Sequence, residues 1–147
     1  MARHENLPRD FPVTVKGYSR IHAWLFHNIY DWAGQNRFVD TGRAGSPFCR
    51  AQFIAPEMAK RFDAIHAENS LRGSHRDAFA ARAGEHACEL NAIHPFLDGN
   101  GRTLRGFLET LALQAGMNLI LRGSARMSGT GLPLSAFSAL TTGRCAM

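Results

Sequence analysis

Long hydrophobic runs, paired cysteines and lysine are scarce in this sequence of 147 residues. No apolar stretch approaches the roughly 20 residues that a membrane-spanning helix needs, and the N-terminus lacks the apolar region of a signal peptide. These absences argue against a membrane protein and predict a cytoplasmic one. The hydrophobic share of 45% argues equally against a disordered chain.

The cysteines Cys49, Cys88 and Cys145 are odd in number and unrelated in spacing. They match neither a disulfide framework nor a paired zinc-binding pattern. We therefore expect three reduced thiols.

Positive charge comes almost entirely from arginine, which supplies fifteen of the 17 basic residues and contributes to a net charge of +5. The arginines are scattered, without a run of four and without interleaved aromatic residues. This distribution argues against nucleic acid as the partner.

The length predicts a single domain over 1–147, and the hydrophobic spacing predicts an all-α fold with one small β-hairpin. A first helix is expected over about 15–33, with Thr14 as its N-cap, Val13 and Tyr18 as a hydrophobic staple and Gly34 as its stop.

Turn residues in 35–55 predict a loop with a short hairpin. Pro56 should open a second helix at its first position, and Ser74–Asp77 should cap a third that ends near Ile93. A fourth helix is expected from about Gly101 to Gly116, and a short last one over about 132–140.

The segment His94-Pro-Phe-Leu-Asp-Gly-Asn-Gly-Arg-Thr-Leu-Arg105 holds the most chemistry. Pro95 should end the preceding helix, which places His94 at a helix C-terminus. The negative end of the helix dipole favours a protonated imidazole there, yet the ring still titrates near neutral pH, as a general base requires.

The second half of this loop is suited to phosphate. Gly99-Asn-Gly101 can point successive N–H groups into one concavity at the start of the next helix. Arg102 and Arg105 share one face of the first turn, and Asp98 is placed to hold Mg²⁺. A base, a carboxylate, an anion site and two cations are what nucleotidyl or phosphoryl transfer requires. The alternative for Arg105 is an ion pair with Glu109, four residues on.

The loop resembles the signature of Fic-domain proteins, His-Pro-Phe-x-[Asp/Glu]-Gly-Asn-[Gly/Ala]-Arg-x-x-Arg, at every specified position. Ile29–Gly34 with Arg37 is similar to another family segment, and Phe48-Cys49 with Ile54–Glu57 resembles the region of its flap. The similarity covers about 12–116, the core of a Fic fold, and leaves a C-terminal tail of about 117–147.

This resemblance implies transfer of AMP from ATP to a Tyr, Thr or Ser hydroxyl of a target protein. His94 would be the base, and Asp98 would hold Mg²⁺. The N–H groups of Gly99, Asn100 and Gly101, with the Asn100 side chain, would bind phosphate, Arg102 the β-phosphate and Arg105 the γ-phosphate. Phe96 would anchor the loop in the core.

Two features concern partners. The flap residues Ser46, Pro47, Phe48 and Cys49 would dock the target through its backbone, unless they form an ordinary surface loop. No Ser or Thr is followed four positions later by Glu, as in the family's inhibitory helix. The resemblance then implies a small antitoxin with such a helix, or an uninhibited enzyme, and the protein would be a toxin or an effector delivered into a host cell.

Alternatives remain at this point. Phosphocholine or another nucleotide is compatible with the loop, whereas the phosphate-transferring Doc branch has Lys in place of Gly101. His86-x-x-Glu89 followed by His94 leaves open a metal hydrolase. A catalytically silent binding module is the third alternative, although all the motif residues are present.

Overall fold

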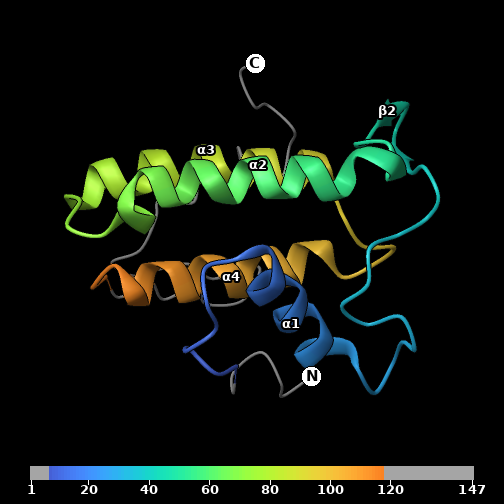
Figure 1. Ribbon diagram of the computed structural model, residues 1–147, viewed down its shortest axis with the longest axis horizontal. Helices are drawn as coiled ribbons and strands as arrows, with labels where there is room; N and C mark the ends of the chain where they lie inside the picture. The colour runs from blue at the N-terminus through green and yellow to red at the C-terminus, as the bar shows by residue number, and fades with distance from the viewer. Residues whose placement is uncertain (1–6, 118–147) are drawn as a thin grey trace.

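The computed structural model describes residues 7–117, which form two layers of helices with a hairpin at one end (Figure 1). The elements in chain order are α1 (Val15–Phe26), β1 (Gly42–Arg43), β2 (Ser46–Pro47), the 3-10 helix η1 (Ala51–Phe53), α2 (Ile54–Ala67), the 3-10 helix η2 (Asn69–Leu71), α3 (Arg76–Ile93) and α4 (Asn100–Gln114). The expected helix at 132–140 and most of the tail lie outside the described residues.

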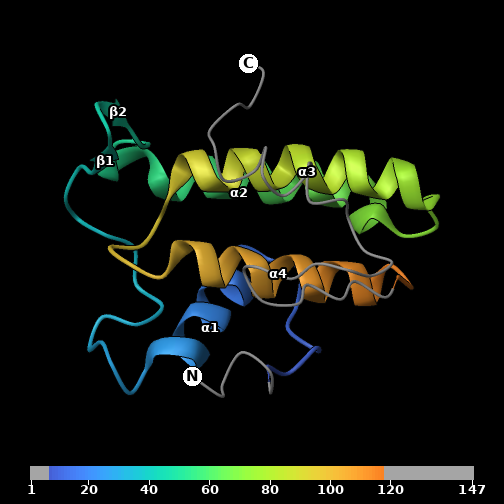
Figure 2. The same cartoon turned by 180° about the vertical axis from the view of Figure 1, so that it is seen from behind.

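The helices α2 and α3 pack side by side in one layer, and α4 packs against both α3 and α1 (Figures 1 and 2). Their apolar faces meet in one core that includes Phe62, Leu90, Phe107 and Leu111. The inward faces of α2 and α3 are buried, with Met58, Phe62 and Ile65 in α2 and Phe79, Ala83, Ala87 and Leu90 in α3. None of the described helices is long and apolar enough to cross a membrane.

The start of α1 follows the sequence prediction. The Thr14 hydroxyl accepts a hydrogen bond from the Gly17 N–H at 2.9 Å, as an N-cap does. Val13 and Tyr18 are both buried.

The predicted end of the first helix is wrong, because α1 ends at Phe26 and not near residue 33. Residues 27–34 turn back along the helix, and the Gly34 N–H binds Nδ1 of His22 at 2.9 Å. The rings of Tyr30 and Trp32 stack with their centroids 4.3 Å apart. The apolar spacing that suggests a longer helix thus belongs to a turn that packs on the helix.

Two other helix starts differ from prediction. The helix α2 begins at Ile54, so Pro56 stands at its third position, where an N–H has no partner within the helix in any case. The N-cap of α3 is His75, without a side-chain cap, so the Ser74–Asp77 capping box does not form.

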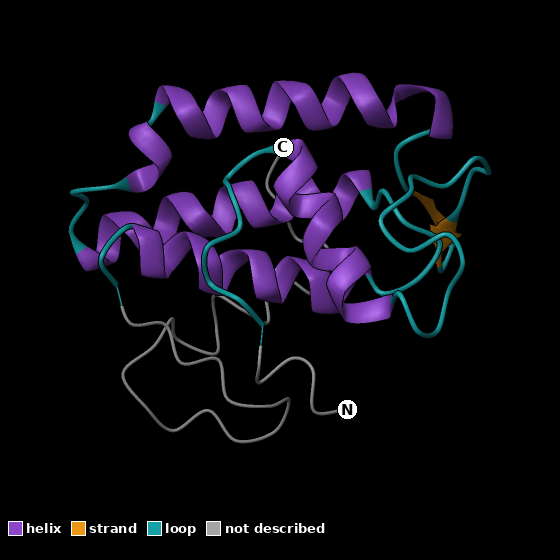
Figure 3. Cartoon of the chain, turned by 60° about the horizontal axis from the view of Figure 1, so that its bottom comes forward, coloured by secondary structure: helices purple, strands orange, loops and turns teal. Residues whose placement is uncertain are grey.

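The hairpin pairs Gly42 with Pro47 and Arg43 with Ser46 in antiparallel register. Its two loop residues, Ala44 and Gly45, have φ of 49° and 81°, the positive values that suit the twist of a two-residue hairpin. The hairpin stands at the end of the bundle, beside the start of α2 (Figure 3).

The cysteine expectation is wrong in part. Cys49 is a free thiol, whereas Cys88 is disulfide-bonded.

Candidate active site

The motif loop connects α3 to α4 and has left-handed backbone at both ends. His94 closes α3 with φ 52°, and its N–H donates to the Leu90 carbonyl at 3.0 Å. Gly99 precedes α4 with φ 81°, and a Cβ atom there would lie 2.4 Å from the Phe26 ring. Only glycine suits both the conformation and this close approach.

The centre of the loop is fixed from within. The buried Asn100 side chain accepts from the Phe96 N–H at 3.0 Å and donates to the Phe96 carbonyl at 2.7 Å. Phe96 is itself buried between Tyr18 and His22, with ring centroids at 6.0 and 3.9 Å. Phe96 therefore packs in the core, and the Asn100 amide makes two hydrogen bonds within the loop.

The His94 imidazole packs against the flap on one face. The Phe48 ring stacks on it with centroids 3.7 Å apart and planes at 3°. Its Nδ1 atom is buried and makes no hydrogen bond of normal geometry among the described residues. This arrangement leaves Nε2 as the nitrogen that can face a substrate.

Burial has the largest effect on the pKa of His94 and lowers it. The Asn91 carbonyl opposes this effect, the charges of Arg43 and Arg37 lower the pKa further, and Asp98 raises it, so that the net shift is downward. The expectation that the helix dipole favours the protonated ring is therefore wrong, because loss of solvent outweighs it. A ring that is neutral at pH 7 is ready to accept a proton.

Asp98 is exposed and ionised. Tyr30 donates its hydroxyl to Oδ2 of this carboxylate. That hydrogen bond, followed by one from the Gly99 amide and the charge of Arg102, lowers the pKa of Asp98. Tyr30 lies in the turn after α1, so the N-terminal part of the chain orients this carboxylate.

His22 is a site residue that sequence reasoning missed. It is fully buried, and its Nε2 donates to the Asp98 carbonyl at 2.9 Å while Nδ1 accepts from Gly34. Burial lowers its pKa, in agreement with the neutral tautomer that these two bonds require. The signal was present in the sequence, since His22 falls on the apolar face of α1, but nothing in the spacing shows its partners.

Arg37 is the second residue whose role the sequence did not reveal. Its guanidinium is buried and donates to four carbonyls: Ile93 at 3.1 Å, His94 at 2.8 Å, Val39 at 2.8 Å and Cys49 at 2.5 Å. Two of these acceptors end α3 and two flank the hairpin. One side chain therefore joins the base to the flap.

The predicted anion site falls at the start of α4. Gly101 and Arg102 are exposed there, and N–H groups in the first turn of a helix have no acceptor within it. The Arg102 guanidinium carbon lies 5.6 Å from the centre of the Phe26 ring. Arg105 Nε lies 3.7 Å from Oε1 of Glu109, so the ion pair that the sequence left open is present.

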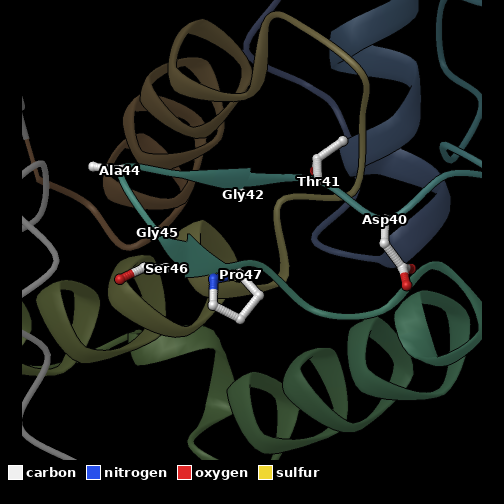
Figure 4. A pocket seen from close by; sticks show the side chains of 7 residues that line it. All are labelled: Asp40, Thr41, Gly42, Ala44, Gly45, Ser46 and Pro47. Carbon is white, nitrogen blue, oxygen red and sulfur yellow. The ribbon is translucent and has the colours of Figure 1, made fainter.

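The flap residues lie beside this loop. Ser46 and Pro47 form β2, and the Phe48 N–H donates to the Thr41 carbonyl at 2.9 Å. The Cys49 N–H donates to the Ala92 carbonyl on α3 at 3.1 Å. A hollow of about 330 Å³ is lined by residues of the hairpin and by Asp40 and Thr41 before it. Figure 4 shows these residues, and both strands are exposed.

The alternative of a metal hydrolase loses its support. His86 is fully buried, with Nε2 3.4 Å from Glu68 and Nδ1 3.4 Å from Arg61, and Glu89 pairs with Arg61 at 3.6 Å. Among residues 7–117 no three side chains of the His, Cys, Asp or Glu type are grouped as a metal site.

The structure is thus a helical domain in which the loop between α3 and α4 begins with a histidine of lowered pKa and adjoins a β-hairpin. The Fic/DOC family model matches residues 12–112, and the chain belongs to this family.

Three relatives show the extent of the similarity. A probable protein adenylyltransferase of Sinorhizobium fredii is 40% identical over 116 residues, which cover 78% of this chain and 60% of the relative. The protein adenylyltransferase VbhT of Bartonella schoenbuchensis is 41% identical over 103 residues, 68% of this chain and 21% of the relative. The chain thus spans less than two thirds of either. The BepC protein of Bartonella tribocorum, solved with bound AMPPNP, superposes with a TM-score of 0.74 at 25% identity, covering 96% of this chain and 74% of that one.

Replacing Tyr30 by Phe should raise the pKa of Asp98 toward its ordinary value, because the largest cause of its depression is removed. A depressed carboxyl pKa contributes stability that is present above the unfolded-state pKa and is lost as pH falls through the folded-state value. The free energy of unfolding of Tyr30→Phe should therefore be lower than that of the wild type by a constant amount at neutral pH, and this difference should shrink below about pH 4. Carbon-13 NMR titration of the carboxyl groups measures the pKa. The Asp31 resonance is the internal control. If the Asp98 titration curves of wild type and Tyr30→Phe superimpose, Tyr30 is not the cause of the lowered Asp98 pKa.

Proposed function

We propose that the protein is an adenylyltransferase that moves AMP from ATP to a Tyr, Thr or Ser hydroxyl of a target protein. The observation that carries the proposal is the neutral, half-buried His94, which shares one short loop with the anion site at the start of α4. The names of the two curated relatives support the same activity, and the BepC structure, solved with bound AMPPNP, supports nucleotide binding.

The reaction follows from these positions. His94 accepts the proton of the target hydroxyl, whose oxygen attacks the α-phosphorus of ATP. The bond from the α-phosphorus to the bridging oxygen breaks, and pyrophosphate leaves with that oxygen. The N–H groups of Gly99, Asn100 and Gly101 would stabilise the charge on the α-phosphate oxygens.

The two loop arginines would bind the leaving group. Arg102 is exposed beside the anion site and is assigned to the β-phosphate. Arg105 lies one turn further along α4 and is assigned to the γ-phosphate. The Glu109 carboxylate contacts Arg105 at Nε, and this contact would orient the guanidinium toward the ligand.

Mg²⁺ fits the residues present. The Asp98 carboxylate is exposed and held in its ionised form, and a single protein carboxylate together with phosphate oxygens is a usual ligand set for this ion. When bound, the ion would neutralise charge on the phosphates. Asp98 is the residue that would hold it, while Tyr30 and His22 fix the position of that carboxylate.

The target would dock on the flap. The hairpin edge exposes backbone groups at Ser46 and Pro47, of which proline can only accept hydrogen bonds, and an extended target segment could pair with it. Phe48 and Cys49 continue this edge to His94 and to α3. Backbone pairing of this kind would hold the hydroxyl beside the base.

Incubation with ATP and a target should add the mass of one AMP, and His94→Ala should lower the rate by about 10² to 10⁴-fold. Because His94 has positive φ, His94→Asn is a second variant that tolerates this backbone and also lacks the base. Intact-mass spectrometry of the modified protein measures the product. A gain of phosphate alone or of phosphocholine overturns the assignment, and near-wild-type labelling by both variants removes His94 from the mechanism.

Asp98→Ala should abolish the Mg²⁺-dependent activity, since the chain then lacks its carboxylate for the ion. The rate of AMP transfer is measured against Mg²⁺ concentration. Asp31→Asn, an exposed change of equal charge in the turn after α1, is the matched control and should keep the wild-type curve. Full activity of Asp98→Ala at low Mg²⁺ would show that the metal role is wrong.

We further propose inhibition in trans, by a small antitoxin whose helix supplies a glutamate near Arg105. Such a carboxylate would compete with the γ-phosphate through a charge-assisted, bidentate interaction, in addition to the contact from Glu109. The chain expressed alone should slow bacterial growth, and a small helical protein encoded beside it should restore growth unless its inhibitory glutamate is changed to glycine. Growth equal to that of a His94→Ala control, with folded protein present, contradicts the toxin hypothesis.

A further inference from the structure

A second hollow is lined by the flap, by α2 and by the last turns of α3, and nothing in the proposed reaction uses it. Its volume is about 450 Å³, within the range of ligand pockets. Its walls include Pro47, Phe48, Phe53 and Ile93, and its acidic side chains are Glu57 of α2 and Glu89 of α3. We call it the flap-side hollow.

The flap-side hollow adjoins the base through a single ring. Phe48 lines the hollow and also stacks on His94 at 3.7 Å. Any segment that places a hydroxyl at His94 therefore has its neighbouring residues close to the hollow. An extended segment advances about 3.3 Å per residue, so these neighbours lie roughly one to three positions from the hydroxyl.

The charges differ on the two sides of Phe48. The loop side carries Arg102 and Arg105, which suit an anionic nucleotide. The flap-side hollow has two carboxylates and one cation, Arg50. Burial raises the pKa of the Cys49 thiol, and the charge of Glu57 raises it further.

About half of the Glu89 side chain, 49%, remains exposed, although Arg61 lies 3.6 Å from it. Phe53 is 49% exposed as well, a large apolar surface beside the two carboxylates. An apolar wall next to exposed acidic groups suits a side chain with an aliphatic stem and a cationic end.

We propose that the flap-side hollow receives a lysine or arginine side chain of the target protein, within about three residues of the modified hydroxyl. The stem would pack on Phe53 and Pro47, and the cation would bind Glu57 and Glu89. This inference rests on the proposed function, because it concerns selection of the target at the same site. Backbone pairing at the flap fixes where the target lies, and this subsite would decide which targets fit.

The binding test uses two fluorescein-labelled peptides, Ala-Lys-Ala-Tyr-Ala-Lys-Ala and its twin with glutamine in place of each lysine. Anisotropy with the full chain in low salt should show the lysine peptide bound about fivefold more tightly, as two partly exposed ion pairs allow. Glu57→Gln/Glu89→Gln should remove this preference. Asp63→Asn/Asp77→Asn is the control, because it changes the net charge equally at exposed positions that do not line the hollow.

Equal binding of the two peptides by the wild-type chain overturns the proposal. So does a loss of the lysine preference in the Asp63→Asn/Asp77→Asn control that equals the loss in Glu57→Gln/Glu89→Gln. The same three proteins and two peptides are then assayed for AMP transfer to tyrosine. A lysine preference in binding without any AMP transfer supports the subsite and contradicts the proposed activity, so the two failures are distinguishable. Labelling of the glutamine peptide should be the same for the Glu57→Gln/Glu89→Gln variant and the wild-type chain.

Discussion

The hydrogen bonds of Arg37 hold together the two parts on which the site depends. A helix leaves its last carbonyls without partners, and at the end of α3 two of these carbonyls belong to Ile93 and His94. The Arg37 guanidinium satisfies Ile93 and His94 and at the same time binds Val39 and Cys49 beside the hairpin. A buried cation at the negative end of a helix is offset by the dipole and by four full acceptors. Lysine could not span these directions, because it has one nitrogen.

The rest of the loop is held from other directions. His22 fixes the Asp98 carbonyl from α1, Tyr30 fixes its carboxylate from the following turn, and Asn100 closes the loop on Phe96. These contacts come from separate elements, so the base and the carboxylate are positioned before any ligand arrives. Such preorganisation is what stabilisation of developing charge requires.

Local sequence determined what could be predicted. The N-cap at Thr14, the end of α3 at Ile93 and the start of α4 follow from residues that act within a few positions of themselves. The end of α1 could not be predicted, because it depends on a bond between Gly34 and the distant ring of His22. The direction of the His94 pKa shift failed for the same reason, since its burial comes from Phe48, which is 46 residues away in the chain.

The preference for arginine over lysine has a structural explanation in these contacts. The Arg37 guanidinium donates to backbone carbonyls. The Arg82 guanidinium binds Glu68 through two nitrogens and Glu85 through its Nη1. Arg61 bridges His86 and Glu89. Each of these roles needs several donors in a fixed plane, which arginine has and an ammonium group lacks. By contrast, the two lysines, Lys16 and Lys60, are both exposed. These three arginines are therefore engaged in contacts within the fold, whereas Arg102 is exposed at the start of α4, where the phosphates of the proposed nucleotide would bind.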